Sequence, residues 1–135
     1  MTNELTRRGC ITWLAAATVA SAVSGHAATP GLPIQLHVDL TVDPDREDEM
    51  LHAFHNTFVP AASQQPGFID ARMLKLQTAL AGAAPQGVNY RFVLTYATEE
   101  QRKHWVETKV HQDVWPLIER TLKSKNYTVL LYDSV

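Results

Sequence analysis

Between positions 34 and 42, apolar and polar residues alternate strictly, and this pattern restricts the fold more than any other feature of the chain. The segment reads Ile-Gln-Leu-His-Val-Asp-Leu-Thr-Val. Because successive side chains of a strand point to opposite faces, the alternation predicts a β-strand with one buried aliphatic face. The opposite, polar face carries Gln35, His37, Asp39 and Thr41.

Helical and strand patterns follow this first strand in a fixed order. An acidic segment after Pro44 begins a helix, and Pro66-Gly67 ends it. The buried stripe of this helix is expected at Met50, Phe54, Phe58 and Ala61. Further strands are expected at 68–77, 90–97 and 127–132, with a small-residue loop at 79–87 and a long second helix from the Thr98 cap to about Ser124.

The resulting order, βαββαβ, predicts an α+β fold of the ferredoxin-like type. Its four strands form one antiparallel sheet, and both helices lie on the same face of that sheet. The other sheet face then needs a cover of its own. A second copy of the chain supplies such a cover most simply, so we expect a homodimer.

The first 27 residues have the order of regions that an export signal has. Arg7-Arg8 precede an apolar stretch at 11–23, and small residues continue to Ala27. The stretch is too short to span a bilayer. It predicts a cleaved, twin-arginine-like signal at 1–27 and a periplasmic or secreted domain at 28–135. A Sec signal, cleavage after Ala22 or Gly25, and an ordinary N-terminal helix are the alternatives.

Composition excludes several classes of function. The single cysteine, Cys10, lies in the predicted signal, so the exported form has no thiolate chemistry or zinc–cysteine site. The net charge of −2 disfavours nucleic acid as a partner. No apolar run is long enough for a stable membrane anchor. No phosphate loop, Ser-His-Asp spacing or pair of active-site carboxylates stands out.

Two histidines in the second helix are the candidates for proton transfer. If residues 98–124 form one continuous helix at 100° per residue, His104 and His111 lie in the middle of the buried face, beside Trp115 and Thr108. Trp105 then lies at the edge of the polar face. The two histidines are about 10 Å apart along the axis, too far to share a metal but close enough to line one pocket. Each could instead pack in the core and bond a carbonyl or a tyrosine.

Polar strand and helix residues give weaker signals. Arg91 and Tyr96 could orient a phenolate or quinone oxygen, although core packing or strand pairing explains them equally well. The spacing of Asp48, His52 and His55 would suit a metal, but their side of the first helix is the solvent side. We therefore expect no metal site there.

The chain resembles the antibiotic biosynthesis monooxygenase family of dimeric α+β barrel proteins. The likeness rests on the element order, on Gln65-Pro66-Gly67-Phe68 before the second strand, and on the segment from Trp105 to Gln112, which contains His111. It implies a homodimer whose sheets form a barrel, with a ligand pocket between each sheet and its helices. It also implies oxygenation of quinol-like or anthrone-like aromatics without metal or flavin, so no resident cofactor is expected. A haem-degrading branch uses an asparagine early in the first strand, where this chain has His37 and Asp39.

The function that this resemblance implies is oxidation of a small aromatic ligand by O2. His111 would be the base, with His104 as a second catalytic candidate. Substrate contacts are expected from Trp105, Trp115, Thr108, Tyr96 and Arg91. The alternative is a non-catalytic, small-ligand-binding or stress-related barrel.

Overall fold

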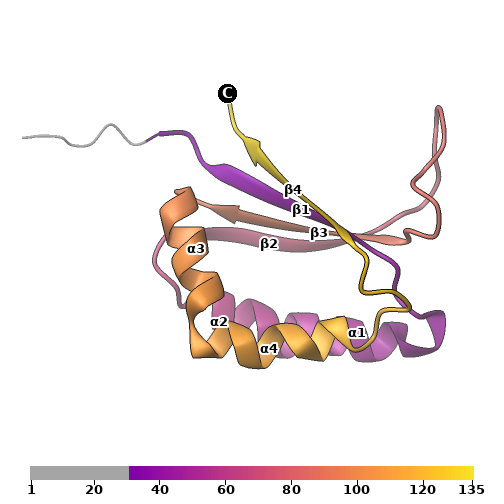
Figure 1. The fold of residues 1–135 in the computed structure, drawn as a ribbon, viewed down its shortest axis with the longest axis horizontal. Helices are drawn as coiled ribbons and strands as arrows, with labels where there is room; N and C mark the ends of the chain where they lie inside the picture. The colour runs from indigo at the N-terminus through magenta and orange to yellow at the C-terminus, as the bar shows by residue number, and fades with distance from the viewer. Residues whose placement is uncertain (1–30) are drawn as a thin grey trace, which may run out of the picture. The chain divides into compact units, whose positions relative to one another are not determined.

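The computed structural model describes residues 31–135, and the predicted export signal at 1–27 lies outside the described residues. The strands are β1 (Ile34–Leu40), β2 (Phe68–Lys75), β3 (Tyr90–Tyr96) and β4 (Thr128–Asp133). They form one antiparallel sheet in the order β2-β3-β1-β4. The helices lie along one face of this sheet (Figure 1). This arrangement confirms the ferredoxin-like fold predicted from the sequence.

The alternation in β1 divides its side chains between the two sheet faces as expected. Ile34, Val38 and Leu40 are buried on the helix side. Val38 pairs with Phe92 of β3 and with Val129 of β4, so one row of apolar side chains crosses three strands. This row forms part of the floor on which the helices pack.

The first helix contains a π-turn that the sequence pattern did not reveal. It comprises a 3₁₀ turn (Pro44–Arg46), α1 (Glu47–Ala53), the π-turn η3 (Phe54–Phe58) and α2 (Val59–Ser63). The N–H of Val59 bonds the carbonyl of Phe54, five residues earlier. Pro60 has no N–H to donate, so the regular series of α-helical hydrogen bonds is interrupted at this point. Beyond the π-turn the buried position moves from the expected Ala61 to Ala62.

The expected single helix at 98–124 is two helices, and this corrects the sequence interpretation. They are α3 (Glu99–Glu107) and α4 (Lys109–Glu119). Thr108 between them is extended, with φ −71° and ψ 151°, and α3 turns steeply away from α4 (Figure 1). Thr98 caps α3 by accepting the N–H of Gln101, as predicted.

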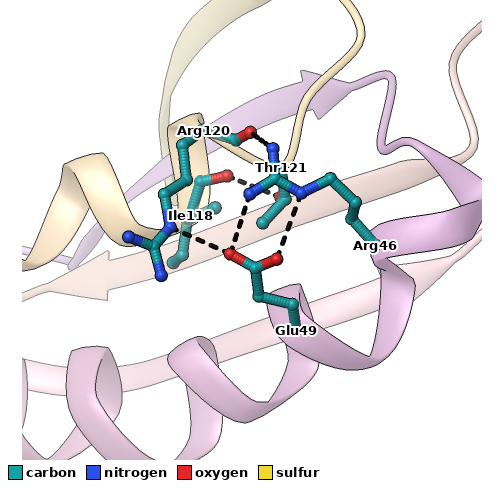
Figure 2. Close-up of polar contacts among 5 residues, drawn as sticks. All are labelled: Arg46, Glu49, Ile118, Arg120 and Thr121. Carbon is teal, nitrogen blue, oxygen red and sulfur yellow. Dashed lines mark hydrogen bonds and ion pairs between the residues drawn. The ribbon is translucent and has the colours of Figure 1, made fainter.

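A small ionic cluster joins the start of the first helix to the end of α4 (Figure 2). The Glu49 carboxylate accepts hydrogen bonds from Arg46 at 3.0 Å and from Arg120 at 2.9 Å. Arg46 also donates to the Arg120 carbonyl, where the negative end of the α4 dipole lies. Arg46, with a contribution from Arg120, holds the pKa of Glu49 below its ordinary value. The cluster links α1 to the C-terminal end of α4.

Within residues 31–135, no helix is both long and apolar enough to cross a membrane. The same residues contain no group of three or more His, Cys, Asp or Glu side chains arranged to hold a metal ion. His52 and His55 are exposed on the first helix, and this confirms the prediction that they lie on its solvent side.

Candidate ligand cavity

An apolar cavity of about 140 Å³, open to solvent on one side, lies between the sheet and the helices. Strands β1, β3 and β4 form its floor, the π-turn forms one end, and α3 and α4 form its roof. Apart from His111, every lining side chain is aliphatic or aromatic. The lining residues are Leu36, Val38, Phe58, Phe92, Leu94, Val106, His111, Trp115, Tyr127 and Val129.

His111 is held in the first turn of α4 by a backbone cap. The Thr108 hydroxyl accepts the His111 N–H at 3.1 Å and donates to the Trp105 carbonyl at 2.7 Å. The imidazole is half-buried, edge-on to Trp105 at 5.1 Å and nearly parallel to Trp115 at 6.5 Å between ring centres. Within the described residues no side-chain hydrogen bond engages the ring.

The environment of His111 favours its neutral form. Burial lowers the pKa of the imidazole below its ordinary value of 6.5, and the positive charge of Arg102 lowers it further. Arg102 is paired with Glu99 through two hydrogen bonds, at 2.6 and 2.7 Å. A neutral imidazole without a hydrogen-bond partner can accept a proton near pH 7.

Trp115 is fixed by a short chain of polar groups. Its indole N–H donates to the Tyr127 hydroxyl at 3.2 Å, and that hydroxyl donates to the Glu119 carboxylate at 2.8 Å. Burial raises the pKa of Tyr127. Tyr127 therefore serves as a wall of the cavity and as an anchor for the indole, rather than as a group that ionises near pH 7.

His104 and Trp105 each lie in the environment that was expected for the other. His104 is exposed and does not line the cavity, so its expected place on the buried face is wrong. Trp105 is 0% exposed, and its Nε1 has no hydrogen-bond partner among the described residues. The reason is the break at Thr108. The axis of α3 differs from that of α4, so positions worked out for one continuous helix do not apply to the residues of α3. Trp105 lies beside His111 without lining the cavity.

Other candidate contacts from the sequence are placed elsewhere. Tyr96 is buried at the end of β3 with a hydroxyl that has no partner among residues 31–135, and burial raises its pKa to about 12. Arg91 lies on the opposite sheet face in a two-bond ion pair with Asp39, at 2.7 and 3.1 Å. His37 is on that face too, 4.7 Å from the Tyr132 ring. The structure thus brings His111 and Trp115 into one cavity, with Thr108 as the cap.

Phe58, Val106 and Tyr127 line the cavity but were not among the expected site residues. The sequence pattern predicts Phe58 as an ordinary core residue and Tyr127 as the first residue of the last strand. The pairing of β4 with β1 brings Val129 to the cavity, and Tyr127 immediately precedes β4. Nothing in the local sequence indicates that pairing.

A larger hollow of about 400 Å³ lies under the connection between β2 and β3. Its three charged side chains already have partners: Asp39 and Arg91 are bonded to each other, and Lys75 is bonded to Glu47 at 2.7 Å. Its wall is otherwise made mainly of the alanines and aliphatic residues of the connection. The smaller cavity is the better candidate because a free imidazole faces it.

The comparisons with known proteins bear on the fold and on the family. The fold is the α+β arrangement of the antibiotic biosynthesis monooxygenases, which confirms the resemblance at the level of the fold. The chain belongs to the family described as "Domain of unknown function (DUF4286)", which it matches over residues 34–114. No curated protein sequence is significantly similar to the chain.

Solved structures of similar fold share little sequence with it. A proposed antibiotic biosynthesis monooxygenase from Caulobacter crescentus has a TM-score of 0.63 and 19% identity, over 78% of this chain and 92% of its own. A dimeric ferredoxin-like protein of unknown function from Jannaschia sp. has a TM-score of 0.64 and 13% identity, over 76% and 99%. A variant of SnoaB, a cofactor-independent oxygenase from Streptomyces nogalater, has a TM-score of 0.59 and 12% identity, over 76% and 92%.

Proposed function

We propose that this chain is an exported, homodimeric oxygenase that oxidises a small aromatic or quinol-type substrate with O2 and needs no cofactor. The observation that carries the proposal is the imidazole of His111 in an otherwise apolar cavity. It is the one side chain of the cavity wall that offers a free basic nitrogen, and its lowered pKa keeps the imidazole neutral at pH 7. The cofactor-independent oxygenase SnoaB, of similar fold, supports this choice of chemistry.

The chemistry needs a base and a dry pocket. Neutral His111 would take a proton from a phenol or an activated C–H group, which leaves an electron-rich anion. That anion passes electrons to O2 and forms a carbon–oxygen bond. When the attacked carbon still carries a hydrogen, as a deprotonated CH2 group or a ring C–H of a phenolate does, one oxygen atom ends in the product carbonyl. The other oxygen leaves as water and takes that hydrogen with it. The proton held by His111 returns to the departing oxygen, and the substrate supplies all the electrons.

Oxygen uptake tests this proposal directly. The purified protein is mixed with one-ring hydroquinones, and O2 consumption above the uncatalysed rate is followed. We expect His111→Ala to lower the catalysed rate by roughly 10²- to 10⁴-fold, the usual range for loss of a general base. His104→Ala is the control, because His104 is exposed and outside the cavity. Full activity in a folded His111→Ala protein would contradict the assignment.

The homodimer is proposed from the sheet face opposite the helices. Leu74, Leu130 and Tyr132 are partly exposed there, around the Asp39–Arg91 pair. The similar structure from Jannaschia sp. is described as dimeric. Size-exclusion chromatography with light scattering should give twice the chain mass. A monomer at micromolar concentration would contradict the packing of two sheets.

Export is proposed from the sequence alone. Arg7-Arg8 and the apolar stretch at 11–23 support a signal that ends at Ala27. Mass spectrometry of the periplasmic fraction should find a chain that starts between Val23 and Ala28. Retention of the full-length chain in the cytoplasm would contradict this.

A binding protein without catalysis is the second candidate. The observation in its favour is that the cavity wall offers His111 alone as a free polar group, with no second donor to orient a substrate oxygen. Such a protein would bind one-ring phenols and leave the rate of O2 consumption unchanged.

A further inference from the structure

We propose that Phe58 sets the depth of the cavity and limits its ligand to about one aromatic ring. This inference rests on the proposed function, because it takes the cavity to be the ligand site. It adds to that function a size limit and the residue that imposes the limit.

Phe58 stands between the cavity and the aromatic core behind it. It is 1% exposed and lines the cavity. Its ring lies 5.2 Å from Phe92, 6.1 Å from Trp115 and 6.4 Å from His111, all of which also line the cavity. It also lies 5.8 Å from Trp105 and 6.1 Å from Phe54, which do not. Removal of the Phe58 ring would therefore extend the cavity toward Trp105 and Phe54.

The backbone fixes Phe58 in this position. Phe58 is the last residue of the π-turn, and the bond from the Val59 N–H to the Phe54 carbonyl closes that turn. Pro60 follows and cannot restore the regular helical ladder. Single π-turns within α-helices are frequent at functional sites. Here the turn changes the helical phase at the point where the helix reaches the cavity.

The cavity volume corresponds to a small ligand. An engineered apolar protein cavity of about 150 Å³ stays dry and binds benzene. The present cavity, about 140 Å³ with aliphatic and aromatic walls, has the same scale. A phenol ring fits this space. Because the cavity is open on one side, a fused two-ring phenol would be buried completely only if it also took the volume that Phe58 occupies.

The test uses two ligands that do not depend on oxygenation. Phenol and 2-naphthol are titrated into the homodimer or monomer as purified, and binding is measured by calorimetry and by tryptophan fluorescence. Wild type should bind phenol at least about tenfold more tightly than 2-naphthol, as expected for several surplus carbons in an apolar pocket. Phe58→Ala should reverse this preference.

Phe54→Ala is the matched control. Phe54 is also 1% exposed, belongs to the same π-turn and contacts Phe92 at 5.8 Å, but it does not line the cavity. It should leave the phenol-to-naphthol preference unchanged. Phe58→Leu is the milder variant in case the alanine variant does not fold, and it should shift the preference in the same direction.

The outcomes separate the size limit from the proposed function. An unchanged preference in folded Phe58→Leu, or equal binding of both ligands by wild type, overturns the size limit. Oxygen uptake that depends on His111 would still stand in either case. If wild type binds neither ligand, the cavity is not the ligand site and the inference fails, whereas oxygen uptake decides the proposed function separately.

Discussion

The Thr108 hydroxyl accepts the backbone N–H of His111 at 3.1 Å, and this one bond begins the helix that carries the candidate base. Thr108 is extended, so the helical hydrogen-bond ladder of α3 does not continue into α4. The position of His111 is therefore set by a cap, rather than by a continuous helix from Thr98.

Loss of this cap should lower stability. Thr108→Ala removes the acceptor for the His111 N–H and should reduce the free energy of unfolding by about 0.5–2 kcal/mol. Thr108→Ser keeps the hydroxyl and should lose less. Chemical denaturation of both variants measures the difference. Equal stability of Thr108→Ala and wild type would show that water replaces the cap without cost.

The lowered pKa of His111 predicts a pH dependence of stability. Burial holds its folded-state pKa below 6.5, so in weak acid the unfolded chain binds more protons than the folded one. The contribution of His111 is fully present above pH 6.5 and is lost as pH falls through the folded-state pKa. In denaturant titrations from pH 7.5 to 4.5, wild type should lose more stability on acidification than His111→Gln. His37, whose pKa is also lowered by burial, is present in both proteins and cancels. A pH-independent difference would contradict the burial of the imidazole.

Gly67 should not tolerate a side chain. Its φ is +86°, and a Cβ built there would lie 2.1 Å from the Gln101 Oε1 atom. The left-handed backbone alone costs an L-residue about 1–2 kcal/mol. Gly82 is the control, since its φ is +68° but nothing lies within 4 Å of a Cβ. Gly67→Ala should therefore lower the melting temperature more than Gly82→Ala. Equal effects would mean that the Gln101 side chain moves aside freely.

Asn89 should stabilise the end of the sheet. Its side-chain amide accepts the Val42 N–H and donates to the Val42 carbonyl, both at 2.8 Å. Asn89→Ala leaves both groups without a partner and should cost about 1–3 kcal/mol in unfolding free energy. Asn89→Asp keeps the acceptor and loses the donor, so it should fall between alanine and wild type. Equilibrium unfolding compares the three proteins.

The sheet was predictable because its signals are local. The alternation from Ile34 to Val42 and the turn at Pro66-Gly67 depend on nearest neighbours, and the structure confirms both. The break at Thr108 was not predictable from helix breakers, since Glu107 and Lys109 on either side are good helix formers and neither Gly nor Pro is present. Only packing of α3 on the core distinguishes a capping threonine from one inside a helix.

The candidate site was predictable in part for the same reason. His111 and Trp115 are four residues apart on α4, so one turn of helix places them together. His104 was misplaced because its position relative to His111 depended on a continuous helix. Phe58 was found only as a core residue, because the π-turn that directs it to the cavity has no strong local pattern beyond Pro60.

The strand order also determines when this chain can become a folded protein. β1 lies between β3 and β4, so the first strand of the sheet pairs with the last. Such distant pairing closes a long loop and slows folding. During synthesis, β1 therefore has an unpaired apolar edge, and the cavity lacks its Val129 wall, until the residues through Asp133 have left the ribosome. Completion of the sheet and completion of the cavity are then one and the same folding event.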